Sequence, residues 1–335
     1  SICELIQNIY FFTGEEKYLL NKEIKRWKDT FVSKFSADSV FSFWPGNFDM
    51  AAFRQTASES GLFFSKKLVF VYGLPLDTDQ TNKVNADTNE SFIDYFLKNP
   101  NISQDVLLIF VSYAPDKRTK LFKYLSENVN MKKFDKLNPA QLRWFVSELL
   151  PGVKFADEAL DYFTFKVWSD LYRVSFEAEK LQLYIKANNL NIIDKKIIND
   201  VVFGMVETNA FLFMDYVLQS PQKAIEIIDK LHNDWQDSNQ TLWMIYRCMK
   251  LYVFMIDLYE QWIRDSKQIA SMTAYHPFAV SKQMKIIDKV IEKKVNIKSF
   301  YESLIDLDVG IKTWRYPESY FWLAIKKMVD KMSVA

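Results

Sequence analysis

The sequence predicts an α/β domain with a parallel sheet, followed by two all-helical domains. Up to residue 137, short apolar runs alternate with helical patterns, which is typical of parallel strands joined by helices. Beyond residue 137, apolar residues recur every three or four positions, as they do on amphipathic helices. Glycine is scarce, with 7 in 335 residues, which favours helices and leaves no glycine-rich loop to hold a cofactor.

The elements expected in residues 1–137 alternate along the chain. The run Val-Leu-Leu-Ile-Phe-Val at 106–111 is continuous and apolar, as in a central parallel strand covered on both faces. The third strand should stop near Gly73, because Pro75 lacks the N–H that a sheet ladder needs. Residues 77–90 are rich in Asp, Asn and Thr and are expected to form a surface insertion. Strands are expected at 9–12, 39–44, 67–72, 106–111 and 131–137, and helices at 19–35, 49–60, 91–98 and 117–127.

After residue 137 only helices are expected, and Asn138 with Pro139 begins the first of them. In residues 138–205 they are expected at 139–150, 157–165, 169–187 and 194–201. In residues 206–335 they are expected at 208–217, 221–231, 240–266, 281–293, 297–307 and 317–332. One apolar stripe at helical spacing is interpreted as core, and it contains Leu242, Ile245, Met249, Tyr252, Val253, Ile256 and Tyr259.

Composition points to an ordinary globular protein. The 43 Lys and Arg residues balance 42 Asp and Glu, so bulk charge does not direct the chain to nucleic acid. Cys3 and Cys248 lie far apart and are interpreted as free thiols in a reducing compartment. No apolar stretch reaches the ~20 residues that span a membrane, and no signal-peptide pattern is present, so a cytoplasmic location is expected.

The sequence predicts no catalytic site, metal or cofactor. His232 and His276 have no partners at metal-ligand spacing. His276 precedes Pro277, which favours a structural or helix-capping role. Asp306 and Asp308 could be read as a metal pair, but they fall at a helix end among apolar neighbours, so this interpretation is not favoured.

Residues 8–20 occupy the place where a nucleotide-binding α/β domain would carry its phosphate loop. An apolar run leads into Gly14, Glu15 and Glu16 and then into an amphipathic helix. A phosphate loop needs several glycines, then Lys and Ser or Thr, to hold phosphate and metal. The two acids suit a helix N-terminus but would repel a nucleotide triphosphate. We therefore predict a degenerate phosphate-loop position.

Two further segments are candidates for binding, and each has a plainer interpretation. Leu62, Phe63 and Phe64 follow Gly61 in an expected turn, where they would form a plug for a partner's pocket. Alternatively they fold under the sheet as core, which the pattern alone favours. Lysines at helical spacing could neutralise DNA phosphates, although a solvated helix face explains them equally simply. These lysines are Lys282, Lys285 and Lys289.

Seven segments, in order along nearly the whole chain, resemble the delta subunit of the bacterial DNA polymerase III clamp loader. Ser169 and Phe176 depart from the Gly and Asn that this family usually has, as in a divergent member. The matching segments are 11–19 (Phe-Phe-Thr-Gly-Glu-Glu-Lys-Tyr-Leu), 61–69 (Gly-Leu-Phe-Phe-Ser-Lys-Lys-Leu-Val), 116–121 (Asp-Lys-Arg-Thr-Lys-Leu), 169–171 with 176–181, 207–211 (Glu-Thr-Asn-Ala-Phe), 269–270 with 276–279 (His-Pro-Phe-Ala), and 308–313 (Asp-Val-Gly-Ile-Lys-Thr).

The resemblance implies an AAA+-related domain at 1–137, a helical lid at 138–205 and a helical collar at 206–335. It implies a subunit that does not hydrolyse ATP, binds the sliding clamp (beta subunit) and opens its ring. Leu62, Phe63 and Phe64 would supply the contact with the clamp, which reverses the interpretation of these residues as core. The collar would join gamma/tau-type and delta-prime-type subunits around primed DNA, in a complex associated with a DNA-directed DNA polymerase, a nucleotidyltransferase.

Two alternatives stay open at this point. The same fold could carry an active nucleotide-dependent enzyme, against which the Gly14-Glu15-Glu16 turn argues. The chain could also be an unrelated helical adaptor, which the absence of a parallel sheet in residues 1–137 would favour.

Overall fold

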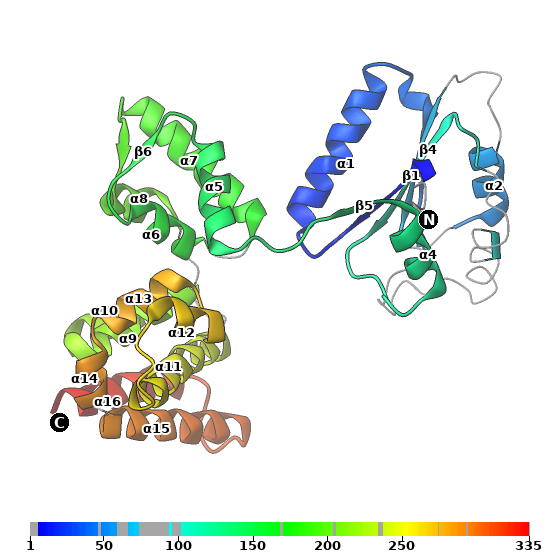
Figure 1. Ribbon diagram of the computed structural model, residues 1–335. Helices are drawn as coiled ribbons and strands as arrows, with labels where there is room; N and C mark the ends of the chain where they lie inside the picture. The colour runs from blue at the N-terminus through cyan, green and yellow to red at the C-terminus, as the bar shows by residue number, and fades with distance from the viewer. Residues whose placement is uncertain are drawn as a thin grey trace. The chain divides into compact units, whose positions relative to one another are not determined.

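The computed structural model describes residues 6–45, 48–58, 66–73, 94–95, 102–167, 170–203, 206–233, 237–273, 275–292 and 294–334. It divides into two compact units, Ser1–Leu137 and Asn138–Ala335, which we call the α/β unit and the helical unit. Figure 1 shows the elements of each. No helix in the described ranges combines the length and the apolar composition that crossing a bilayer requires.

The α/β unit is built on a parallel sheet, as the sequence predicts. Within the described residues its order is β2-β3-β4-β1-β5, so β1 lies between two strands that come later in the chain. Phe11 pairs with Phe110 on one side and with Met131 on the other. The helical-adaptor alternative would have been favoured by the absence of this sheet, and the sheet is present. The strands are β1 (Ile6–Thr13), β2 (Val40–Phe43), β3 (Lys67–Tyr72), β4 (Val106–Ser112) and β5 (Val129–Lys133).

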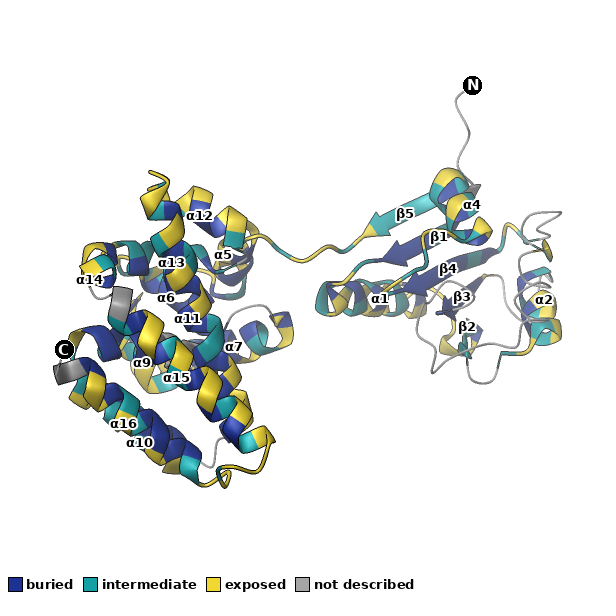
Figure 2. Ribbon diagram, turned by 90° about the horizontal axis from the view of Figure 1, so that it is seen from below, coloured by how far each residue is buried: buried dark blue, intermediate teal, exposed yellow. Residues whose placement is uncertain are grey.

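Helices cover both faces of this sheet. Side chains alternate along a strand, so Phe12 packs with the buried residues of α1 (Lys17–Val32). Phe11 packs on the other face with α2 (Met50–Ser58) and α4 (Lys120–Asn128). Burial on both faces explains why β3 and β4 are apolar almost throughout, and Figure 2 shows them as buried.

Two boundaries in the α/β unit differ from prediction. β5 spans Val129 to Lys133, not residues 131–137, because β1, the strand with which it pairs, ends at Thr13 opposite Lys133. α4 begins at residue 120, not 117, because the Thr119 hydroxyl caps it by accepting from Phe122. The predicted insertion at 77–90 lies outside the described residues, as does the helix at 91–98 apart from helical residues 94–95.

The helical unit begins at the predicted place. Asn138 and Gln141 form a reciprocal capping box, with Pro139 in the first turn. Its division into two domains near residue 205 stays a prediction. The helices are α5 (Pro139–Leu149), α6 (Ala159–Lys166), α7 (Leu171–Ala187), α8 (Lys195–Val201), α9 (Val206–Gln219), α10 (Pro221–Asn233), α11 (Ser238–Glu260), α12 (Ser266–Thr273), α13 (Pro277–Met284), α14 (Ile287–Glu292), α15 (Lys294–Lys312) and α16 (Tyr320–Val334).

In the helical unit the structure differs from the prediction in three places. A two-residue parallel ladder joins β6 (Lys154–Phe155) to β7 (Ile192–Ile193), where only helices were expected. α12 was not predicted. The helix expected at 281–293 is two helices, because the backbone tightens after Met284, with Lys285 donating to Lys282 O.

Candidate functional site

The turn between β1 and α1 is closed by the chain itself. Gly14 has φ +140°, and a Cβ there would lie 2.2 Å from the carbonyl oxygen of Phe134. The Phe134 N–H donates to Thr13 O at 2.8 Å, and Phe134 O accepts from the Glu16 N–H at 2.9 Å. The close approach that Gly14 permits is therefore to the peptide that follows β5.

Glu16 occupies the start of α1. Its side chain is buried, with the residue 4% exposed, and its Oε1 accepts from the Tyr18 N–H at 3.3 Å. The Lys17 N–H donates to Glu15 O at 3.0 Å. A phosphate at a helix start needs these backbone donors and a positive field. Here the donors are engaged and a carboxylate stands among them, so the residues present do not fit a nucleotide phosphate.

An ion-pair cluster holds β5 against α1 next to this turn. Lys132 donates to Glu23 Oε1 at 2.7 Å, and Arg26 binds the same carboxylate with two hydrogen bonds. Arg26 above all, helped by Lys132 and Trp27, lowers the pKa of Glu23 to about 2. The cluster keeps Phe134, two residues after Lys132, over the turn.

Leu62, Phe63 and Phe64 lie outside the described residues, but both flanks of their segment are described. On one side, the Ser103 N–H donates to Ala57 O at 2.9 Å. On the other, Lys66 pairs with Asp105 at 2.9 Å, and the Lys67 N–H donates to Asp105 O at 2.9 Å. The flanks are thus anchored at the amino ends of the strands, whereas Gly14–Glu16 lies at their carboxyl ends.

The three candidate DNA-binding lysines have unequal surroundings. Lys282 lies 2.5 Å from Asp215 Oδ2, and Lys285 lies 3.2 Å from Oε1 of Glu158, whose Oε2 pairs with Lys195. Lys289 is exposed on α14. They do not share one continuous helix, because α13 ends at Met284.

Lys282 has a structural role that its sequence pattern did not indicate. Asp215 is 4% exposed, and its Oδ1 accepts from the Tyr252 hydroxyl at 3.1 Å and from the Gln283 amide. Lys282 supplies the compensating charge that a buried carboxylate requires. The DNA role of these lysines stays a prediction.

His276 caps a helix, as predicted. It is the N-cap of α13, where its Nδ1 accepts from the Phe278 N–H at 3.0 Å and Pro277 occupies the first turn. Thr164 Oγ1 lies 3.4 Å from the other ring nitrogen. Burial lowers the pKa of His276 to about 4, so the ring is neutral near pH 7. Within the described ranges, no cluster of His, Cys, Asp or Glu is placed to hold a metal, and Cys248 is buried and forms no disulfide there.

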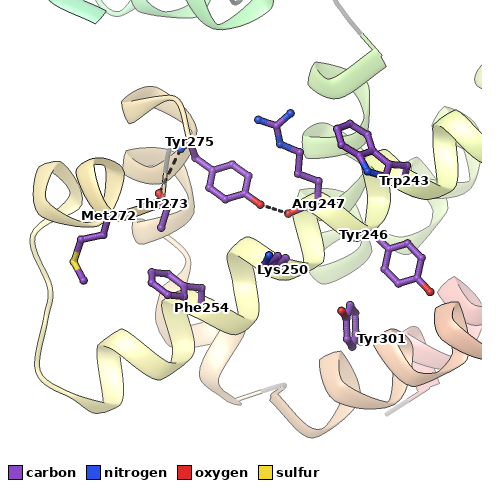
Figure 3. Close-up of a pocket in the computed structure, with 9 residues that line it drawn as sticks. All are labelled: Trp243, Tyr246, Arg247, Lys250, Phe254, Met272, Thr273, Tyr275 and Tyr301. Carbon is purple, nitrogen blue, oxygen red and sulfur yellow. Dashed lines mark hydrogen bonds between the residues drawn. The ribbon is translucent and has the colours of Figure 1, made fainter. Parts of the chain in front are cut away.

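Sequence reasoning missed one concave surface, which lies in the helical unit along α11. Its volume is about 600 Å³. Figure 3 shows Trp243 and Arg247 side by side on α11, with Tyr275 reaching towards Arg247. The sequence did contain a signal for this surface. Trp243, Arg247, Lys250 and Phe254 recur every three or four positions, on a different side of the helix from the core stripe. The lining residues are Trp243, Tyr246, Arg247, Lys250, Phe254, Met272, Thr273, Tyr275 and Tyr301.

Comparison with known proteins identifies the family. A family model described as DNA polymerase III, delta subunit, matches residues 10–135. A second, described as the C-terminal domain of the same subunit, matches residues 207–326. Together they cover well over half of the chain. DNA polymerase III subunit delta of Bacillus subtilis (strain 168) is 23% identical over 319 residues, which are 92% of this chain and 88% of that protein.

One solved structure supports the fold. The Bacillus subtilis DNA clamp loader delta protein (YqeN) is similar at a TM-score of 0.57 and 19% identity, over 97% of this chain and 96% of that one. A RuvB structure from Thermotoga maritima is a weaker likeness, at a TM-score of 0.36 and 11% identity over 58% of this chain and 60% of that one. The chain therefore belongs to the DNA polymerase III delta subunit family, and its function is that of a clamp loader delta subunit in DNA replication.

Proposed function

We propose that this chain binds the sliding clamp and opens, or holds open, one interface of the ring, so that the ring can be placed on primed DNA. The observation that carries the proposal is the family match over residues 10–135, a span that includes Leu62, Phe63 and Phe64. Adjacent large apolar side chains at a protein surface mark sites of protein–protein contact.

The anchored flanks of residues 59–65 support this assignment. α2 and β3 are tied to the start of β4 through Ala57, Lys66 and Lys67. A contact segment held at both ends loses less conformational freedom on binding than a free one, so more of its contact energy appears as affinity.

The mechanism needs no catalytic residue in this chain. A protein that binds the opened ring more tightly than the closed ring shifts the clamp's own equilibrium towards the opened form. The closed turn at Gly14–Glu16 supports a subunit that leaves ATP binding and hydrolysis to its sister subunits. Any nucleotidyltransferase activity then belongs to the polymerase with which the loader associates.

The helical unit supplies the other contacts of this proposal. Residues 138–205 form a lid domain, and residues 206–335 form a collar that joins gamma/tau-type and delta-prime-type subunits, with primed DNA inside the assembly. Lys285 and Lys289, which are exposed, are the better DNA candidates, because Lys282 neutralises Asp215. The assembly works in the bacterial cytoplasm.

The test measures affinity of the full chain for the cognate sliding clamp, by surface plasmon resonance. The double variant Leu62→Ala with Phe63→Ala is expected to weaken binding by several kcal/mol, because it removes two anchors from a desolvated contact. Ring opening is followed in parallel, with a fluorophore pair across one clamp interface, and should be reduced in the same variant.

A matched control removes similar apolar atoms elsewhere in the α/β unit. Val32 and Phe35 are 40% and 38% exposed near the end of α1, so Val32→Ala with Phe35→Ala should leave clamp affinity unchanged. If the wild type and the Leu62/Phe63 variant bind the clamp with equal affinity, the assignment of the clamp contact to these residues is wrong. Loss of affinity in the control alone would place the contact on α1 instead.

A further inference from the structure

We propose that the pocket along α11 binds single-stranded DNA, with one base stacked on Trp243 and a backbone phosphate held by Arg247 and Lys250. None of the three lysines considered above, on α13, α14 and the turn between them, lines this pocket. The site extends the proposed function, in which primed DNA lies inside the assembly, but it does not depend on the clamp contact.

Side chains of α11 make up much of the pocket lining. Trp243, Arg247, Lys250 and Phe254 follow one another at spacings of four, three and four, which places them on one side of the helix. The core stripe occupies another side, where Leu242, Ile245, Met249 and Tyr252 are buried. Trp243 is 55% exposed, so its ring is available to a ligand.

Two aromatic rings lie beside the Arg247 guanidinium. Its guanidinium carbon lies 5.6 Å from the centroid of the Trp243 ring and 5.6 Å from that of the Tyr275 ring. The Tyr275 hydroxyl donates to the Arg247 carbonyl oxygen at 2.5 Å, which fixes one ring beside the cation (Figure 3). A guanidinium held between aromatic rings keeps its planar fork of donors aligned for a phosphate.

The pocket lining carries cationic side chains. The described lining residues include Arg247 and Lys250 but no carboxylate, in a chain whose charges otherwise balance. Asp308 acts on the lining from outside it, where it helps burial to raise the pKa of Tyr246 to about 12. Asp308 is itself paired with Lys312 at 2.8 Å. The pocket therefore presents a positive surface to an incoming anion.

Size and shape favour an unpaired strand. A volume of about 600 Å³ is that of an ordinary ligand site, large enough for a nucleotide unit. Tyr246 and Tyr301 form a second aromatic wall, with ring centroids 5.7 Å apart and an angle of 84° between the ring planes. Aromatic rings beside cations bind single strands because the unpaired base offers its face, whereas a duplex hides it.

The test is fluorescence anisotropy of the full chain with a labelled oligothymidylate, of the roughly 4–16 nucleotides that such sites cover. The variant Trp243→Ala is expected to weaken binding roughly tenfold or more, because it removes one stacking surface. Arg247→Gln with Lys250→Gln should also weaken binding and lower the salt dependence of log K by about 1.4. A blunt duplex of the same length should compete poorly.

Matched controls separate this site from general binding. Trp144 is 66% exposed on α5, and the Lys25 side chain is 79% exposed on α1, so Trp144→Ala and Lys25→Gln should bind as the wild type does. Circular dichroism confirms that every variant is folded. The proposal is overturned if the wild type does not bind the oligonucleotide, if the pocket variants bind equally well, if the controls weaken binding as much, or if duplex competes equally.

Clamp affinity is measured for the same variants, so that the two proposals can fail separately. The Trp243 and Arg247/Lys250 variants should bind the clamp as the wild type does. If Leu62→Ala with Phe63→Ala leaves clamp affinity unchanged while Trp243→Ala still loses DNA, the clamp contact is wrong and the α11 site stands. If instead the Leu62/Phe63 variant loses clamp affinity while Trp243→Ala binds DNA as the wild type does, the α11 site is wrong and the clamp contact stands.

Discussion

Two regions of this molecule contrast in their capacity to bind anions. The turn after β1 lies where parallel α/β domains bind phosphates, yet Phe134 and Glu16 fill it. The side of α11 that carries Trp243, Arg247 and Lys250 belongs to no recognised phosphate motif, yet it is open, aromatic and cationic. Position in a fold therefore does not by itself predict binding. What matters is which groups stand at the place: a backbone carbonyl and a carboxylate in the turn, aromatic rings and cations on α11.

The largest expected effect comes from forcing the closed turn apart. In Gly14→Ala, the new Cβ would lie 2.2 Å from Phe134 O, at a φ of +140° that alanine rarely adopts. We expect the free energy of unfolding to fall by about 3 kcal/mol or more, because overpacking and backbone strain add. Urea unfolding of the full chain measures it.

Gly152→Ala is the matched control for this change. Gly152 also has positive φ, at +78°, but a Cβ there meets nothing within 4 Å. Strain alone should cost about 1 kcal/mol. Equal losses in the two variants would mean that the approach of Phe134 does not constrain the turn, and the contrast with α11 would weaken.

The second effect concerns the start of α13, where the His276 side chain accepts a hydrogen bond from the Phe278 N–H. The His276 pKa of about 4 lies below the ordinary value of 6.5. Between these values the unfolded chain binds a proton that the folded chain does not. The contribution of His276 to stability is therefore complete above about pH 6.5 and falls as the pH drops towards 4, by on the order of 3 kcal/mol.

Urea unfolding across this pH range, in wild type and His276→Asn, isolates the contribution. Asparagine keeps an N-cap acceptor but does not titrate, so the variant should show a shallower loss of stability on acidification. His232→Asn, at an exposed position, should keep the wild-type profile. Identical profiles for all three proteins would show that His276 is not the group responsible.

The smallest effect compares Lys282, which is paired with Asp215, with Lys250, which lines the pocket on α11. Lys282→Met leaves the Asp215 carboxylate buried without its cation, and we expect a loss of about 2 kcal/mol, reduced because the Lys282 side chain is 40% exposed. Lys250→Met, on the pocket side of α11, should change stability by less than about 0.5 kcal/mol. Thermal unfolding of both variants provides the comparison.

Adding Asp215→Asn to Lys282→Met should recover much of the loss, since the amide keeps an oxygen for Tyr252 without the charge. If Lys250→Met instead proves as costly as Lys282→Met, the cations along α11 are structural and the pocket is not an open site.

Local pattern predicted much of this fold. The apolar runs at 67–72 and 106–111 are strands of the parallel sheet, and Asn138 begins the helical unit. The pattern failed where distant residues decide. β6 and β7 are too short to show a period, and Val253, expected in the core, is 45% exposed. The role of Leu62 and its neighbours remains a prediction.

The sequence by itself determined which residues could be strands and helices, because burial on one or two faces leaves a period in the chain. It also determined that Gly14-Glu15-Glu16 lacks the residues of a phosphate loop. Only the tertiary structure decided that Phe134 closes this turn and that Tyr275 and Tyr301 complete the pocket on α11. These contacts join residues far apart in sequence, and local periodicity carries no information about such pairs.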